Sequence, residues 1–473
     1  MCLKEMKTLF KFCVILFFPI CANGQITTFQ STGNKLFSQH YSDTLIGCNS
    51  DTTQRLSVGP RFFGIGSASK SDYTSTYLLG ATVSVNIKNK IAVISHFDYL
   101  GGNHNLLINE YQDSLLVFPG FGREKTRFQY KLKYYVNKFI TADLGKGKHF
   151  IGNGYRSLLL SAEHSPYPYL KLTTEFGRVT YYNLYTTFLD IQNPNQDRKK
   201  HASIHFLDFR LTDNISVGVF EGVLWQAKDE NYHRGYDVEY LNPIIFYRPV
   251  EFSKHSPDNV LMGATFNAKY SAITLYGQVL LDDLNISRQK DRDEDFSGGF
   301  FQNKFAYQLG VKSSFKRINT LLEYNQAQPY TYAHKEPMQS YTHVNQALAH
   351  PLGANFKEVV ALANYSKEKW KFSTKLTLVK VGLDSIHTHY GQNIFASDFD
   401  AQGDGGEYSY GNFNGQGVAT QINTLYTEVA YSFKWFDLFG SVFHKKKKSD
   451  LLDQTSVFYS VGLRTFPFSN PQY

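Results

Sequence analysis

The sequence TSVFYSVGLRTF, residues 455–466, alternates in polarity residue by residue near the C-terminus. Successive side chains of a β-strand point to opposite faces, so this stretch has one apolar face and one mixed, mostly polar face. The apolar face carries Val457, Tyr459, Val461 and Leu463. An aromatic-rich strand at this place in a long chain indicates the closing strand of a barrel. The remaining sequence must supply the other strands and decide whether the apolar face meets lipid or a core.

From residue 55 onward the same texture repeats. Segments of about ten residues alternate in polarity and are separated by Gly, Asn, Asp and Lys turns, which is typical of outer-membrane barrel strands. We expect about 18 strands, an even number within the range of such barrels. The expected strands cover residues 56–67, 77–87, 91–99, 127–136, 139–144, 169–176, 179–191, 203–211, 215–223, 260–270, 272–281, 305–315, 318–327, 356–366, 369–381, 420–433, 435–444 and 455–466.

The strand expected at residues 369–381 indicates which strand face meets lipid and which meets the lumen. Its apolar side chains, Trp370 and Leu376 among them, alternate with Lys371 and Lys375. Near the middle of a bilayer each lysine on the lipid face would cost about 2–4 kcal/mol, so these lysines must face a wet lumen. The apolar faces of the strands, including that of the last one, are therefore predicted to face lipid.

The connections between the expected strands alternate in length. Short turns, such as residues 270–271 and 316–317, alternate with long stretches at 282–304, 328–355 and 383–419. Outer-membrane barrels have short periplasmic turns and long extracellular loops. We therefore predict an all-β fold: a transmembrane, antiparallel outer-membrane β-barrel with this asymmetry.

The N-terminus has the pattern of an export signal. Lys4, Lys7 and Lys11 precede or flank the apolar stretch 9–20, and Ala22-Asn23-Gly24 is a small-x-small cleavage site. We expect residues 1–24 to be a signal peptide cleaved after Gly24, and the mature protein to lie in the cell outer membrane. Residues 25–54 would form an N-terminal lead or plug segment, or a loose terminus, with a short helix at 36–41. Residues 55–473 would form the barrel.

No apolar run of 18 or more residues follows the signal, so no transmembrane helix is expected. A closed barrel is the other structure that satisfies every backbone polar group in lipid. Of the four cysteines only Cys48 lies beyond the signal, which excludes an intrachain disulfide in the mature protein. The net charge of +8 is spread out apart from the run Lys445 to Lys448, which we interpret as a solvated strand end or loop and not as a nucleic-acid patch.

The sequence offers no catalytic or metal-binding constellation. It has no Gly-x-Ser-x-Gly, and no set of Ser, His and Asp can be singled out. His387 and His389 lack a third ligand of suitable spacing, and the acidic loops at 291–295 and 398–407 lack the spacing of a calcium loop. The glycine-rich stretch 145–154 lacks the helix that follows a phosphate-binding loop, so we interpret it as a tight turn between strands. A protein without enzymatic activity, cofactor or metal is expected.

The connection 240–259 is unusual because it contains three prolines. Proline cannot sit inside a central strand, so this segment should be a folded excursion, with the lumen as one place for it. It would be either an ordered structural loop or a constriction that faces a ligand. Tyrosine rings stack on sugars and charged side chains hydrogen-bond to hydroxyl groups. The candidate ligand-binding residues, here and in the later long loops, are Tyr240, Tyr247, Arg248, Glu251, Tyr330, Tyr332, Tyr408 and Tyr410.

Two segments carry a family resemblance. Residues 145–172, GKGKHFIGNGYRSLLLSAEHSPYPYLKL, resemble the Wzi capsule-assembly family of outer-membrane proteins, in which a glycine-rich turn precedes a Ser-Leu-Leu-Leu-Ser strand. Residues 239–259, EYLNPIIFYRPVEFSKHSPDN, look like the corresponding segment in the Bacteroidetes branch, which includes the RemB-like gliding-motility proteins. With the similar length and exported all-β texture, the resemblance extends over most of the mature chain.

The resemblance implies a barrel of about 18 strands that associates with surface polysaccharide. In the capsule branch such a barrel is a lectin-like anchor, and in the Bacteroidetes branch the link is to gliding motility or surface adhesion. The implied partners are outer-membrane lipid, surface polysaccharide and gliding or surface-machinery proteins. This chain departs from the capsule branch in its short segment before Arg55, which leaves little room for a helical bundle. The alternative function is a porin or substrate-specific channel, which the wet, mixed-charge lumen would suit.

Overall fold

We analysed the fold in a computed structural model. The structure describes residues 26–28, 44–46, 54–69, 73–87, 90–104, 115–118, 120–193, 195–228, 234–243, 258–284, 299–385, 388–402 and 409–465. The expected signal peptide and the short helix expected at 36–41 lie outside these residues.

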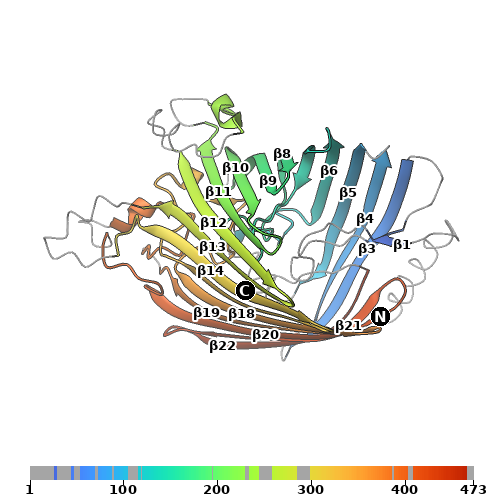
Figure 1. The fold of residues 1–473 in the computed structure, drawn as a ribbon. Helices are drawn as coiled ribbons and strands as arrows, with labels where there is room; N and C mark the ends of the chain where they lie inside the picture. Colours follow the sequence, from blue (N-terminus) through green and yellow to red (C-terminus); the bar gives the residue numbers. More distant parts are fainter. Residues whose placement is uncertain are drawn as a thin grey trace.

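The described chain forms one closed antiparallel barrel of 18 strands (Figure 1), which confirms the predicted fold class and strand number. Each strand hydrogen-bonds to its neighbour along the chain. The strands are β3(Gln54–Ala68), β4(Tyr73–Ile87), β5(Ile91–Asn103), β6(Thr126–Tyr135), β7(Ile140–Gly147), β8(Tyr167–Phe176), β9(Val179–Asp190), β10(Arg198–Arg210), β11(Ile215–Gln226), β12(Asn259–Tyr270), β13(Ile273–Asp283), β14(Lys304–Phe315), β15(Ile318–Ala327), β18(Phe356–Lys367), β19(Trp370–Leu383), β20(Val418–Ser432), β21(Asp437–Lys448) and β22(Asp453–Arg464).

A few short elements lie outside the barrel wall. β1(Ile26–Thr28) pairs with β2(Thr44–Ile46), and β16(Thr342–His343) pairs with β17(Gln346–Ala347). The described residues also form the 3₁₀ turns η1(Val238–Leu241), η3(Pro337–Gln339) and η4(Asp398–Gln402). Among the described residues, no helix has the length and apolar character needed to cross a bilayer.

The barrel closes where β22 pairs with β3. This seam is short, running over the six residue pairs from Tyr459↔Ala68 to Arg464↔Phe63. Side chains reinforce it: the hydroxyl groups of Ser67 and Ser460 lie 2.9 Å apart, and Phe62 N donates to Thr465 Oγ1 at 2.8 Å. The stretch 455–466 is thus the closing strand that its alternation predicted.

Side-chain direction follows the predicted parity. On β22, Tyr459 and Val461 face outward and are 62% and 65% exposed, whereas Phe458 faces inward and is buried. Arg464, on the inward parity, donates to Glu428 of β20 at 2.7 Å. On β19, inward Lys375 donates to the hydroxyl group of Tyr155 at 2.9 Å. The lysines on the inward parity therefore meet polar partners inside the barrel, as predicted.

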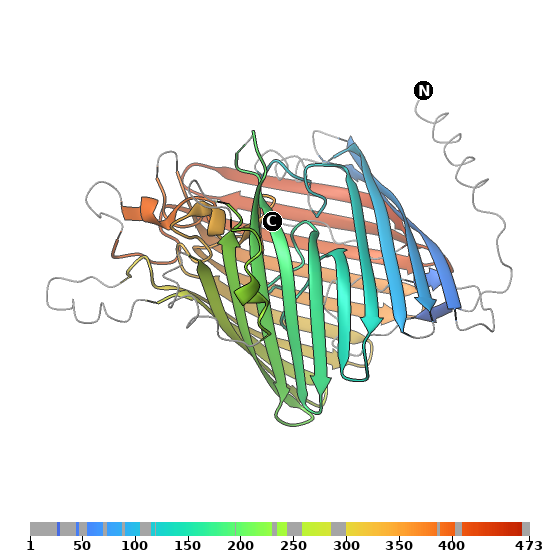
Figure 2. The same cartoon turned by 90° about the horizontal axis from the view of Figure 1, so that it is seen from above.

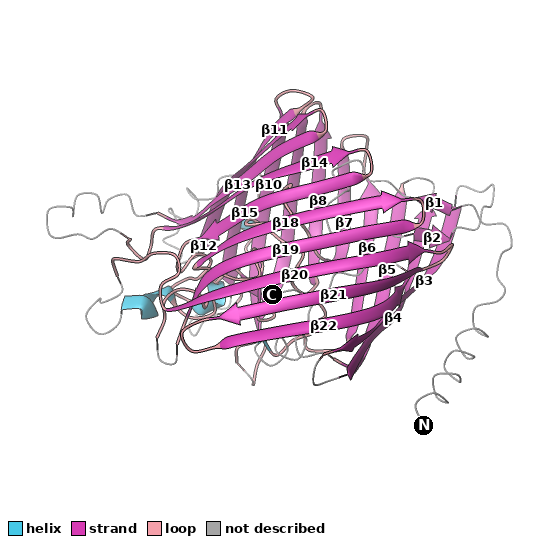
Figure 3. Ribbon diagram, turned by 90° about the horizontal axis from the view of Figure 1, so that it is seen from below, coloured by secondary structure: helices cyan, strands magenta, loops and turns pink. Residues whose placement is uncertain are grey.

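The long connections all lie at one end of the barrel. One end has only short turns, of which residues 177–178, 316–317 and 368–369 are examples. The other end has the long connections together with the short ones at 69–72 and 449–452. The coloured parts of the long connections extend beyond the strands at this end (Figures 1 and 2). Seen from below, the strands slant across the barrel wall (Figure 3). By the usual asymmetry of these barrels, the end with long connections is extracellular.

The fold predicts opposite responses to one charge placed on the two faces of β22. Aspartate in place of the lipid-facing Val461 should impair assembly into membranes, because an ionised group on that face must be desolvated. Aspartate in place of Ser456 should be tolerated, because Ser456 is on the inward parity and opposite Lys445 in the register. Assembly is measured by heat-modifiable migration on gels after membrane extraction. Equal assembly of the V461D and S456D variants would contradict the assignment of faces.

Candidate functional site

A segment that leaves β7 crosses the whole lumen. It occupies residues 148–166 and brings Arg156 to Glu358 on β18, where Nη2 and Oε1 are 3.2 Å apart. β7 and β18 are diametrically opposed, because eight strands separate them in each direction: β8 to β15 on one side, and β19 to β22 with β3 to β6 on the other. The expected tight turn at 145–154 is therefore wrong. β7 ends at Gly147 and the chain turns into the barrel instead of continuing the wall.

Glu323 of β15 anchors this crossing segment through backbone groups. Its carboxylate accepts hydrogen bonds from the amides of Tyr155 at 2.7 Å and Arg156 at 3.0 Å. The hydroxyl group of Tyr276 on β13 donates to the same carboxylate at 2.7 Å, and Asn325 Nδ2 donates at 2.9 Å. A buried carboxylate is stable only when its oxygens have such partners. The wall thus supplies a preformed acceptor for the tip of the segment.

Glu358 joins the crossing segment to a second inward segment, residues 328–355. Besides the ion pair with Arg156, its carboxylate lies 2.7 Å from His350 Nε2. The side chains of Arg156, Glu358 and His350 are all at least nine-tenths buried. Burial is the largest single influence and would lower the pKa of Arg156, but Glu358 together with Tyr155 and Glu163 outweighs it, so the pKa is raised. The guanidinium of Arg156 therefore stays charged. Through Arg156, Glu358 and His350 the crossing segment, the second inward segment and the barrel wall are bound to one another.

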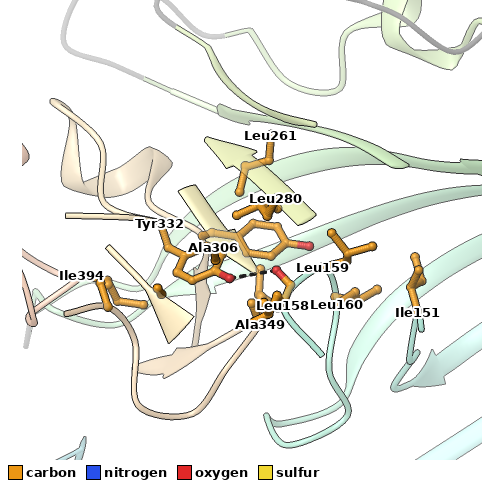
Figure 4. Packing of buried hydrophobic residues seen from close by; sticks show 14 of the residues in the cluster. Ile151, Leu158, Leu159, Leu160, Leu261, Leu280, Ala306, Tyr332, Ala349 and Ile394 are labelled. Atoms are coloured by element: carbon orange, nitrogen blue, oxygen red, sulfur yellow. Dashed lines mark hydrogen bonds between the residues drawn. The ribbon is translucent and has the colours of Figure 1, made fainter. Parts of the chain in front are cut away.

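An apolar layer covers the other side of the crossing segment. Leu158, Leu159 and Leu160 are completely buried in the main core cluster, which also contains inward residues of β8 to β15 and β18 to β20. Tyr332 of the second inward segment donates through its hydroxyl group to Leu158 O at 2.8 Å (Figure 4). The Ser-Leu-Leu-Leu-Ser stretch is not the strand that the resemblance implied: it makes only an isolated bridge from Leu160 to Ile151.

Two of the predicted ligand-binding tyrosines are part of this packing. Tyr330 and Tyr332 are both 0% exposed. The hydroxyl group of Tyr330 donates to His389 O at 2.8 Å, and the backbone amide of Tyr332 donates to Asp282 at 2.6 Å. Their expected role as exposed stacking faces is wrong for this structure, because their rings and hydroxyl groups are already used inside the protein.

Tyr240 is also buried, but on the outside of the barrel. Its ring packs 4.8 Å from that of Trp225, and its hydroxyl group donates to Asp258 at 2.8 Å. Its carbonyl accepts from Ser203, an outward residue of β10, at 2.6 Å. The described residues 234–243, which include the start of the excursion, therefore lie against the outer wall at β9 to β12, in front of the strands in Figure 2. These residues therefore do not lie in the lumen, which was one of the places expected for the excursion.

Tyr410 alone among the described candidates stays partly exposed. Its ring lies 5.2 Å from Phe300, which contacts Phe301 at 4.9 Å, and Phe301 in turn contacts Phe399 at 5.7 Å. We call Phe300, Phe301, Tyr330, Phe399 and Tyr410 the rim cluster, since it comes from three long connections at the extracellular end. Phe399 is 38% exposed. The other candidates, Tyr247, Arg248, Glu251 and Tyr408, lie outside the described residues.

The residues that hold the lumen together were not singled out from the sequence. In the sequence Glu323, Glu358 and Arg156 are isolated charged residues that belong to no recognisable motif. Only the strand register and the path of the crossing segment bring them within bonding distance. The one available signal was parity, since Glu323 falls on the strand face opposite to that of Leu322 and Tyr324, and Glu358 on the face opposite to that of Val359. Within the described ranges, no group of three or more His, Cys, Asp or Glu side chains is placed to hold a metal ion.

Comparison with known proteins bears on the fold. No protein-family model matches the chain, and no curated protein sequence matches it significantly. Among solved structures, Wzi of Escherichia coli, described as an outer-membrane protein involved in group 1 capsule assembly and a carbohydrate-binding β-barrel, is similar with a TM-score of 0.55 and 14% identity, covering 86% of this chain and 85% of that chain. OprD of Pseudomonas aeruginosa is similar with a TM-score of 0.47 and 10% identity, covering 88% and 96%.

The likeness to Wzi shows that the chain has the fold of an outer-membrane barrel. It supports the Wzi resemblance at the level of the fold, over most of the length of both chains. The gliding-motility branch of the resemblance stays a prediction.

The ion pair to Glu358 predicts how the crossing segment can be released. In the E358Q variant Arg156 keeps its charge but loses its closer carboxylate partner, which leaves only Glu163 at 3.8 Å. Breaking a buried ion pair in this way costs up to about 3–5 kcal/mol. We expect the segment to detach from β18, which increases ionic conductance in planar bilayers and exposes the segment to protease. The matched control is R123Q, which removes a half-exposed ion pair to Asp197 and should change neither measurement. Unchanged conductance and protection in E358Q would show that the pair does not hold the segment.

Acid should loosen the same packing. His164 of the crossing segment and His343 of the second inward segment are buried with their rings 6.3 Å apart. Burial lowers the pKa of His164 to about 4 and that of His343 well below its usual value. A released segment takes up protons below about pH 6.5, whereas the packed one stays neutral, so the packed state loses stability as the pH falls from about 6.5 toward 4. Conductance and protease sensitivity should rise over this window, and less so in H164Q.

Proposed function

We propose that this protein is a non-enzymatic outer-membrane barrel that binds a surface polysaccharide at its extracellular end. The observation that carries the proposal is the crossing segment, which runs from β7 to β18 and is fixed by the Arg156–Glu358 pair. A porin needs a water-filled path through the barrel. A segment fixed across the full width of the lumen obstructs such a path and favours a role at the surface.

The rim cluster gives this role a candidate binding surface. Phe399 and Tyr410 expose part of their rings at the end that carries the long connections, and the ammonium group of Lys335 lies 5.2 Å from the ring of Phe399. Exposed aromatic rings provide apolar faces for sugar rings, and a nearby cation suits the carboxylates of acidic polysaccharides. The carbohydrate binding named for Wzi, whose fold is similar, supports the same class of ligand. A role in capsule retention or in gliding and surface adhesion is consistent with such binding.

A channel is the second candidate, and one observation favours it. Lys131 and Lys133 on the inward parity of β6 are only half-buried, as is Tyr135. This side of the lumen is therefore more polar and less packed than the side lined by β8 to β15. Planar-bilayer recording separates the two functions. Absence of conductance agrees with polysaccharide binding at the surface. Steady open conductance of the native protein would instead favour the channel.

Loss of the rim rings should weaken polysaccharide binding. We expect the F399A/Y410A double variant to bind capsular or other surface polysaccharide from its own cells about tenfold more weakly, because each lost stacking contact removes about 0.5–1.5 kcal/mol. Retention on glycan-coated beads measures this. The control is F176A, which removes a more exposed ring at the short-turn end, where Phe176 contacts Phe139 at 5.4 Å. Equal retention of all three proteins would reject the rim cluster as the binding surface.

A further inference from the structure

Exposed lysines form a row on the outer face of the barrel. Lys357 of β18 lies directly opposite Lys380 of β19, and the register continues through Gln421 of β20 to Lys448 of β21. Lys446 lies on the same face of β21, two residues before Lys448 and in the register row of Leu378. All four ammonium-bearing side chains are exposed and on the parity that elsewhere carries lipid-facing residues. Part of the basic run at 445–448 therefore belongs to a surface that four adjacent strands form together.

The pair of Lys357 and Lys380 is unfavourable without an anion. Directly opposed residues in an antiparallel pair have Cβ atoms about 5 Å apart, and like charges in this position destabilise the sheet. The flanking partners in the register are uncharged: Gln326 of β15 beside Lys357 and Gln421 beside Lys380. Within the described part of the chain, neither lysine forms an ion pair. The nearest carboxylate in the row is that of Asp453, which lies opposite Lys448 at its far end.

The row lies at the extracellular boundary of the lipid-facing band. One step toward the short-turn end, the same face carries Val359 and Leu378, and Leu376 follows. Tyr307 and Tyr324 mark the boundary, because both hydroxyl groups donate to Gln326 Oε1, at 3.0 and 2.7 Å. Tyr324 lies opposite Val359 in the register. Tyrosines beside an apolar surface whose hydroxyl groups bond to a polar residue are typical of the interface between hydrocarbon and headgroups.

We propose that Lys357 and Lys380, assisted by Lys446 and Lys448, bind a phosphate group of a phosphorylated glycolipid in the outer leaflet of the membrane. A phosphate between the two ammonium groups removes their repulsion and accepts charge-assisted hydrogen bonds from both. The side-chain amide of Gln421 adds an uncharged donor between Lys380 and Lys448. Because the row lies beside the hydrocarbon band, its phosphate belongs to a lipid whose acyl chains extend along Leu378 and Leu376. This lipid site is separate from the rim cluster and does not depend on polysaccharide binding.

The test compares lipid binding by the intact barrel and two matched variants. Purified protein is titrated in detergent with lipid A that carries both phosphates, with the same lipid after dephosphorylation as the second ligand, and bound lipid is counted by native mass spectrometry. The K357Q/K380Q variant should bind phosphorylated lipid A about tenfold more weakly, because charge-assisted bonds are lost. The control, K367Q/K369Q, neutralises two lysines at the short-turn end of the same hairpin and should bind like the native protein. Dephosphorylated lipid should bind all three proteins equally weakly.

Two results would overturn the proposal. Equal affinity of K357Q/K380Q and the native protein for phosphorylated lipid A would show that the row is not a phosphate site. Weaker retention of acidic surface polysaccharide by this variant, with unchanged lipid A binding, would assign the row to the polysaccharide. Both substitutions are at exposed positions, and heat-modifiable migration confirms that each variant is folded. Failure of polysaccharide binding at the rim cluster would leave the lipid measurement unaffected.

Discussion

The short seam between β22 and β3 is the contact on which the rest of this structure depends. In lipid, every backbone N–H and C=O must be paired within the protein, so a sheet can cross a membrane only if its first and last strands meet. Here six residue pairs join strands almost four hundred positions apart in the sequence, and the Ser67–Ser460 and Phe62–Thr465 contacts add side-chain bonds to them. Once the seam forms, the parity of each strand decides which side chains meet lipid and which meet the lumen.

Closure also creates an interior where charges need partners. The walls place Glu323 and Glu358 in it, and each would be costly alone. The crossing segment supplies the backbone amides of residues 155 and 156 and the guanidinium of Arg156, and the second inward segment supplies His350. Removing one partner of a buried ion pair destabilises a protein by more free energy than the intact pair contributes to its stability. The lumen and its two inward segments are therefore mutually dependent, which gives the barrel an obstructed interior.

The outer wall is not uniformly apolar. Two of its polar regions differ in whether other parts of the protein cover them. On β9 and β10, His205 and Asn183 face outward and bond to each other at 2.7 Å. Residues 234–243 cover this region, and the hydroxyl group of Tyr185 donates to Leu241 O at 2.9 Å. On β18 and β19, Lys357 and Lys380 stay uncovered at the edge of the hydrocarbon band. Protein satisfies the first region, whereas the second is open to a ligand from the membrane itself.

The sequence by itself determined the wall of this protein. The two-residue period of side chains gave the strands, and the cost of lysine in lipid fixed the inward face of β19. The alternation of short and long connections distinguished the two ends of the barrel. The strands, the inward face and the two ends could all be predicted because each depends on residues that are neighbours in the sequence. The tertiary structure decided what the long connections do. Residues 148–166, interpreted as beginning with a tight turn, cross the lumen, whereas Tyr240 lies on the outer wall and Tyr330 and Tyr332 are buried. Those outcomes depend on contacts such as Arg156–Glu358, whose members are about two hundred residues apart, and on the strand register that opposes Lys357 to Lys380. No local pattern encodes either distance, since both exist only after the barrel has closed.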